Sequence, residues 1–231
     1  MVSLPVTDTE GQSRQRLWQL LSPTLPIGAY AFSGGLEAAV QAGWVRRLED
    51  VDAWLRGQLR HNLSVTDIPL LARLHAAWQA DDDARLRHLS RRLRACRETA
   101  ELASEDRHLG QALARLLRDL ELPAAAPWVD RPDASWATLF SLALVAWRIP
   151  LADGAEAYLW SWCENQTAAA IKLVPLGQTD GQRLLLGLAQ PVMQAATDGL
   201  QLRDEAIGGS APGVAIASSQ HETQYSRLFR S

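Results

Sequence analysis

Residues 135–147 read SWATLFSLALVAW, a stretch without a charged side chain. Asp133 or Ser135 is placed to cap the start of a helix here, and the helix would continue to about Trp147. A helix at a protein surface keeps one polar face, and this stretch has none. It therefore predicts a helix buried at the centre of the fold, with other helices packed around it.

The composition extends this prediction to the whole chain. The 231 residues include 37 Leu and 36 Ala, but only 17 Val and Ile together. Leu and Ala favour helices, whereas β-branched residues favour strands. No alternating strand pattern bounded by hairpin turns occurs, so we expect an all-α fold with a single compact multi-helix domain.

The other helices are expected wherever apolar residues recur at helical spacing. Ser33, Thr66 and Thr179 are predicted N-caps, and Pro69 falls in the first turn after Thr66. Pro191 is expected to kink or split the last long helix. The predicted helices cover 13–21, 33–43, 50–62, 66 onward, two within 82–120, 153–174 and 179 onward.

The chain is expected to divide into a helical domain, 1–207, and a flexible C-terminal partner-binding tail, 208–231. The tail begins with GGSAPG, a composition typical of a flexible connector, and chain ends are commonly poorly ordered. We expect the tail to be mobile alone and ordered by a partner. Packing of the tail back onto its own dimer is the alternative.

The end of the tail carries five candidate partner-binding residues. Tyr225, Leu228 and Phe229 are spaced i, i+3 and i+4, so a helix would align them as one apolar stripe. Arg227 and Arg230 would flank this stripe. There they would pair with acidic groups on a partner.

Three observations bear on the cellular compartment. The uncharged stretch 17–36 contains two prolines and three glycines, too many helix breakers for a membrane span. The N-terminal sequence MVSLPVTDTEGQSRQR lacks the basic-then-apolar pattern of a signal peptide. Cys96 and Cys163 form neither a CxxC pair nor a metal-ligand spacing. We expect a cytoplasmic protein with no membrane segment.

The residues predict no catalytic, cofactor or metal site. GAYAFSGG at 28–35 lacks the Lys-Ser or Lys-Thr pair of a phosphate-binding loop, and AFSGG lacks the first glycine of a hydrolase nucleophile elbow. His221 and Glu222 begin like the zinc motif HExxH, but Tyr225 stands where the second histidine is required. These absences favour a non-enzymatic protein.

Two charged features leave alternatives open. Six arginines within thirteen residues form a basic helix that either binds nucleic acid or an acidic partner, or is a solvated face balanced by neighbouring acids. The net charge of −3 argues against a dedicated nucleic-acid binder. Lys172 is the only lysine among 23 cationic residues. The six arginines are Arg85, Arg87, Arg91, Arg92, Arg94 and Arg97.

Four segments carry a family resemblance: LLSPTLPIGAYAFSGGLE at 20–37, CRETAELASEDRHLGQALARLL at 96–117, AAAIKLVPLGQTDGQRLL at 168–185 and HETQYSRLFRS at 221–231. In this order and spacing they resemble the UreF family of urease accessory proteins, over nearly the whole chain. The resemblance implies an all-α, homodimeric, non-enzymatic chaperone in the maturation of nickel urease.

The resemblance also implies partners. They are UreD (called UreH in some organisms), the GTPase UreG and apo-urease. Nickel and GTP would be handled by the assembly, with no cofactor bound by this chain. A basic-helix nucleic-acid-binding module, or another helical interaction module, is the alternative function.

The family motifs add seven candidate partner-binding residues. Glu37 and Lys172 are hypothesised to lie near the surface that docks the GTPase, with an internal salt bridge or a helix-end charge as the alternative. Gly177 is expected to adopt a left-handed or otherwise open conformation at a helix end, which lets another backbone approach. The seven are Ser33, Gly35, Glu37, Lys172, Pro175, Gly177 and Gln178.

Overall fold

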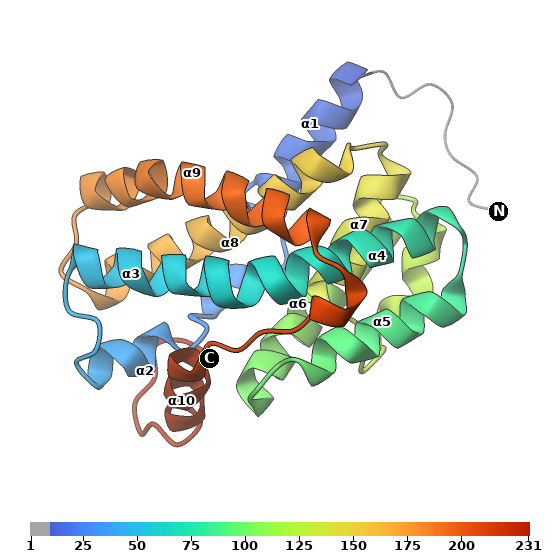
Figure 1. Ribbon diagram of the computed structural model, residues 1–231. Helices are drawn as coiled ribbons and strands as arrows, with labels where there is room; N and C mark the ends of the chain where they lie inside the picture. Colours follow the sequence, from blue (N-terminus) through green and yellow to red (C-terminus); the bar gives the residue numbers. More distant parts are fainter. Residues whose placement is uncertain (1–9) are drawn as a thin grey trace.

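The computed structural model describes residues 10–231, which form helices joined by short loops (Figure 1). The described residues contain no strand, so the all-α prediction is confirmed. Residues 1–9 of the predicted 1–207 domain, which include most of the stretch tested for a signal peptide, lie outside the described residues. The α-helices are α1 (Glu10–Leu21), α2 (Leu36–Gln41), α3 (Leu48–Gln58), α4 (Ile68–Gln79), α5 (Asp83–Ala95), α6 (Ala100–Asp119), α7 (Trp136–Ala146), α8 (Leu151–Leu173), α9 (Gln178–Gln201) and α10 (Pro212–His221).

Helix α7 is the buried central helix that the sequence predicts. The Ser135 hydroxyl caps it by accepting the N–H of Thr138 at 3.1 Å. Helices α4, α6 and α8 pack against it. The indole N–H of Trp78 on α4 donates to the Thr138 carbonyl at 2.9 Å. An apolar helix with no polar face is thus covered by other helices.

The predicted break between residues 62 and 66 is wrong. Leu59–Asp67 form a π-helical segment that joins α3 to α4 without a loop, and Thr66 is buried within it instead of capping a new helix. Pro69 does lie in the first turn of α4. Because proline has no N–H, it cannot donate to the Val65 carbonyl four residues earlier. That carbonyl accepts the N–H of Gly208 at 2.9 Å and so anchors the start of the C-terminal segment.

Of the kink or split predicted at Pro191, the split does not occur, because α9 continues through it. The proline again lacks the N–H that would bond to a carbonyl four residues earlier, here that of Gly187. Arg56 on α3 donates to this carbonyl from its Nη2 at 2.8 Å. At Pro69 and at Pro191, the carbonyl four residues earlier is therefore used by a tertiary contact.

Two helix starts differ from the predicted caps. Helix α2 begins at Leu36 after Gly35 instead of at Ser33, although the Ser33 hydroxyl still accepts the N–H of Glu37 at 3.3 Å. Gly35 has φ of 83°, and a Cβ there would lie 3.1 Å from the backbone nitrogen of Ser218 on α10, so glycine permits this close packing. At α9 the cap is Gly177, and Thr179 lies inside the helix.

The interpretation of the arginine-rich helix as a solvated face is wrong for Arg97. Its guanidinium is buried and donates to both carboxylate oxygens of Asp67 at 2.7 and 3.0 Å and to Asp106 at 3.3 Å. The Tyr158 hydroxyl donates to Asp67 at 2.8 Å, and Asp106 accepts the N–H of Trp136 at 2.9 Å. We call Asp67, Arg97, Asp106 and Tyr158 the core ion cluster. Burial opposes the charge of Arg97, but Asp106 and Asp67 hold its pKa well above the ordinary value.

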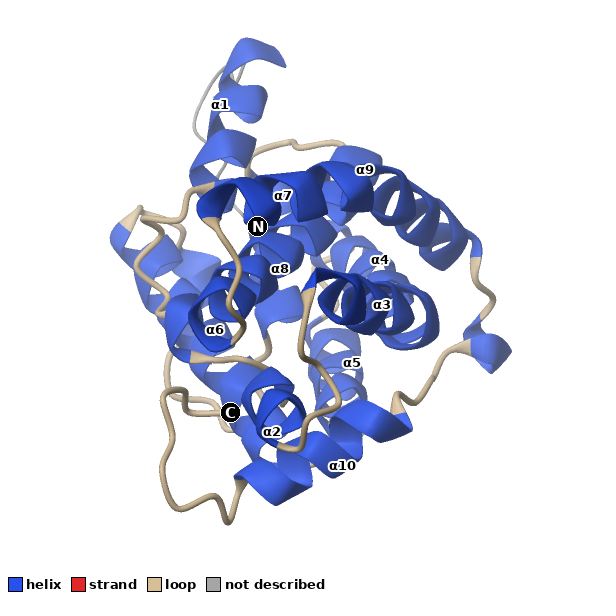
Figure 2. Ribbon diagram, turned by 90° about the vertical axis from the view of Figure 1, so that its left-hand side faces the viewer, coloured by secondary structure: helices blue, strands red, loops and turns tan. Residues whose placement is uncertain are grey.

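Residues 208–231 contact the helical domain. Helix α10 lies beside α2, as both ribbon views show, and also contacts α6 (Figures 1 and 2). Residues 222–231 then continue without a helix, so the predicted apolar stripe does not form. Tyr225 and Leu228 are exposed, whereas Phe229 is buried. The mobility of this segment in solution stays a prediction. In the described part of the chain, no helix is long and apolar enough to cross a membrane.

Candidate functional site at the C-terminal segment

The carboxylate of Glu37 is the main anchor of residues 222–231. It lies in the first turn of α2 and is only 7% exposed. Its oxygens accept the backbone N–H groups of Leu228 at 2.7 Å and Phe229 at 2.8 Å. The Gln224 amide donates to it at 3.3 Å. In a helix, the backbone N–H groups of Leu228 and Phe229 would bond to the carbonyls four residues earlier. Because Glu37 accepts these N–H groups instead, no helix forms here.

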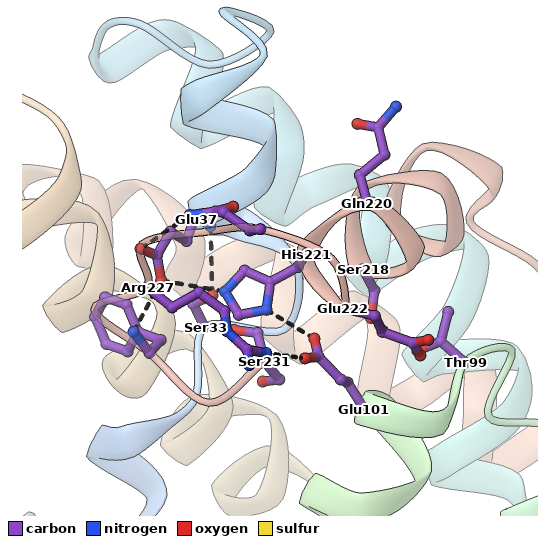
Figure 3. Close-up of polar contacts among 12 residues, drawn as sticks. Ser33, Glu37, Thr99, Glu101, Ser218, Gln220, His221, Glu222, Arg227 and Ser231 are labelled. Carbon is purple, nitrogen blue, oxygen red and sulfur yellow. Dashed lines mark hydrogen bonds and ion pairs between the residues drawn. The ribbon is translucent and has the colours of Figure 1, made fainter.

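His221 and Arg227 extend this anchor to α6 (Figure 3). The fully buried His221 ring places Nε2 3.2 Å from Glu37 and Nδ1 2.7 Å from Glu101. The ring therefore bridges a carboxylate on α2 and a carboxylate on α6. Arg227 donates to the other oxygen of Glu101 at 2.8 Å. We call Glu37, Glu101, His221 and Arg227 the terminal latch.

A second anchor holds Ser231, which is fully buried. Its carbonyl accepts from the Ser33 N–H at 3.1 Å and from the Ser33 hydroxyl, and its own hydroxyl accepts the Gly34 N–H at 3.2 Å. The Ser231 hydroxyl donates to Glu105 on α6 at 2.7 Å. Burial raises the pKa of Glu105 to about 7, although this hydrogen bond acts to lower it.

Lys172 joins the same site from the end of α8. Its ammonium lies 5.5 Å from the centre of the Phe229 ring, a cation–π distance, and the lysine side chain is otherwise exposed. Phe229 therefore contacts the GLE segment through its backbone and the KLVPLGQ segment through its ring. Three motifs far apart in the sequence meet at one residue.

Apart from Tyr225, Leu228 and Phe229, described above, the predicted site residues fall into three groups. Ser33, Gly35 and Glu37 are buried beneath the terminal segment or α10, so Glu37 takes the internal position of its two alternatives. Lys172, Arg227 and Arg230 surround Phe229 at or near the surface. The third group lies in the exposed connection from α8 to α9, where Gly177 is extended (φ −78°, ψ 161°), the open form of its two predicted conformations. That group is Pro175, Gly177 and Gln178, the last of which is the first residue of α9.

Sequence reasoning missed three residues of the site. It treated His221 as part of an incomplete zinc motif and took Glu101 and Glu105 only as two of the neighbouring acids that balance the arginine-rich helix. The two glutamates are four residues apart and so share one face of α6, which was the available clue. Their partners His221 and Ser231 are 120 and 126 residues away, respectively, and only the folded chain brings them together.

The site is built for holding a peptide segment. Carboxylates, hydroxyls and backbone groups satisfy one another within it. Among residues 10–231, no group of three or more His, Cys, Asp or Glu side chains is arranged to hold a metal ion.

The fold and the site define an all-α protein whose C-terminal segment docks against its own helices through buried carboxylates. The UreF family profile matches residues 45–189. Over 221 residues, covering 96% of this chain and 97% of the relative, the chain is 67% identical to the urease accessory protein UreF of Alkalilimnicola ehrlichii. It is 47% identical to the proteins of that name from Hahella chejuensis (94% of this chain, 97% of the relative) and Azoarcus sp. strain BH72 (94% of each). The chain belongs to the UreF family of urease accessory proteins.

Proposed function

We propose that this chain is a non-enzymatic scaffold that joins UreD (UreH) to the GTPase UreG during urease maturation. In this proposal the assembly acts on apo-urease, GTP is hydrolysed by UreG, and nickel is the cargo instead of a resident cofactor. The chain acts in the cytoplasm as a homodimer. Membership in the UreF family supports the accessory role.

The observation that carries the proposal is the meeting of three family motifs at Phe229. Glu37 of the GLE segment and Lys172 of the KLVPLGQ segment both contact this residue of the terminal RLFRS segment. Lys172, Tyr225 and Leu228 remain exposed around it. The terminal segment also exposes Tyr225, Arg227 and Arg230, and tyrosine and arginine are enriched at protein interfaces.

The arginine-rich helix supports this proposal over the nucleic-acid alternative. Arg97 is buried in the core ion cluster, and Arg92 donates to the Ile207 carbonyl at 3.1 Å. Arg87 pairs with Asp83, and Arg85 lies 3.9 Å from Asp204. Most of this positive charge is therefore used within the chain, which leaves no continuous track for phosphates.

The test is co-purification of UreD and UreG with three forms of the full chain: wild type, Lys172→Ala, and a deletion of residues 222–231. Removing 210–231 would also remove α10 and expose α2, so the shorter deletion isolates the terminal segment. We expect the deletion to stay folded and dimeric by light scattering but to lose UreD. Lys172→Ala should weaken urease activation, with a melting temperature within a few degrees of wild type.

The matched control is Arg203→Ala, which removes an exposed cation outside the site. It should behave as wild type in every measurement. Undiminished capture of UreD by the deletion would contradict the proposed role of the terminal segment. Capture of neither UreD nor UreG by the wild-type protein would contradict the scaffold itself.

A further inference from the structure

An open groove of about 910 Å³ lies between α6 and the terminal segment. Four arginines line it: Arg94 at the end of α5, Arg107 on α6, and Arg227 and Arg230 on the terminal segment. The buried rings of Phe32 and Phe229 also line it. We call this the arginine groove. Two consecutive helices and the terminal segment, which is distant in the sequence, supply its positive charge.

The groove has little internal compensation for this charge. Its lining includes one carboxylate, that of Glu101, which already binds His221 and Arg227. In the described part of the chain, the Arg107 side chain makes one hydrogen bond, to the Ser104 hydroxyl at 3.4 Å. Within residues 10–231, neither Arg94 nor Arg230 has an ion-pair partner. The guanidinium groups of Arg94, Arg107 and Arg230 thus line the arginine groove without an ion-pair partner among the described residues.

We propose that the arginine groove binds an acidic segment, rich in Asp and Glu, of a partner protein. Guanidinium groups bind carboxylates through paired N–H donors, and several of them along one groove match several carboxylates along one chain. The volume exceeds that of a single bound ion. The inference deepens the proposed role of the terminal segment by assigning the chemistry of what it binds.

A protein segment fits this surface better than a nucleic acid does. The terminal segment that forms one wall also exposes Leu228 and Tyr225, and tyrosine is a residue type on which protein partners commonly anchor. The chain as a whole carries a net charge of −3, so a long polyanion would be repelled beyond the groove. A short acidic stretch places its charge only where the arginines lie.

The test is fluorescence anisotropy of a fluorescein-labelled decaglutamate peptide with the full-length protein. Binding should weaken as salt is raised, because the contacts are ionic. The double variant Arg94→Gln/Arg107→Gln should bind the peptide about tenfold more weakly or worse, since two charge-assisted contacts are lost. The matched control Arg91→Gln/Arg115→Gln removes two exposed arginines from α5 and α6 outside the groove, and it should bind within about twofold of wild type.

Several outcomes would overturn the inference. They are no binding by the wild-type protein, an equal loss in the control variant, and tighter groove-dependent binding of a ten-nucleotide single-stranded DNA. Full displacement of the peptide by equimolar pyrophosphate would also overturn it, because a small-anion site would then explain the arginines.

Capture of UreD and UreG by the same proteins separates this inference from the proposed function. Groove-dependent peptide binding without capture by the wild type would uphold the groove and contradict the scaffold. Normal capture of UreD and UreG without peptide binding would uphold the scaffold and contradict the groove.

Discussion

The core ion cluster and the terminal latch use the same chemistry in different surroundings. In the cluster, the side chains of Arg97 and Asp67 are 12% and 1% exposed, and helices enclose them. In the latch, the side chains of Arg227 and Glu101 are 41% and 13% exposed, and one side of the latch is a segment without a helix. Opening the cluster requires the helical body to separate, whereas opening the latch releases only about ten residues. The same type of ion pair therefore lies within the helical body in one place and holds the terminal segment against that body in the other.

The largest expected effect comes from removing the cation of the core ion cluster. Arg97→Met leaves the carboxylates of Asp67 and Asp106 buried without their shared partner. The free energy of unfolding should fall by about 3–5 kcal/mol, measured by urea denaturation. Arg91→Met, on the exposed face of the same arginine-rich stretch, should change it by less than about 0.5 kcal/mol. Equal effects of the two changes would show that the cluster does not hold the helices together.

A smaller and local effect is expected at the terminal latch. Glu37→Gln replaces one acceptor oxygen with an amide NH₂, which faces backbone N–H donors of Leu228 or Phe229. The loss should be about 1–3 kcal/mol and confined to the terminal segment. Amide hydrogen exchange should accelerate by roughly 10-fold or more in residues 222–231 and stay unchanged in α7.

Two comparisons make this exchange experiment decisive. In the wild-type protein, residues 222–231 should already exchange faster than α7, because so few contacts hold them. Glu156→Gln changes an exposed carboxylate on α8 and should leave exchange at both places unchanged. Faster exchange throughout the protein with Glu37→Gln would mean that the latch is part of the global fold.

The smallest effect is a pH dependence at the Ser231 anchor. Burial raises the pKa of Glu105 to about 7, while in the unfolded chain it is near its ordinary value of 4.5. Between these values the folded protein keeps a proton that the unfolded chain has released, so stability falls as pH rises through this window. Allowing for partial exposure, wild type should lose about 1–2 kcal/mol more than Glu105→Gln between about pH 4.5 and pH 7.5. Parallel stability curves for the two proteins would contradict this assignment.

The sequence predicted the elements that local chemistry controls. The apolar run of α7, its Ser135 cap and the Pro69 position could be recognised because each depends on a few neighbouring residues. The split at Pro191 and the break before Thr66 were predicted wrongly for one reason. The carbonyl four residues before Pro191 accepts a hydrogen bond from Arg56, and the carbonyl four residues before Pro69 accepts one from the N–H of Gly208.

By itself, the sequence determined the all-α class, the central buried helix and the family, because composition, periodicity and ordered motifs are properties of the chain read in order. It also indicated Glu37, Lys172 and Phe229 as residues of interest. Only the tertiary structure decided that these residues meet, that His221 lies between two carboxylates, and that Arg97 is buried while Arg94 faces an open groove. The physical reason is that hydrogen bonds and charge pairing depend on distances of about 3 Å. Only folding brings groups separated by more than a hundred residues to such distances.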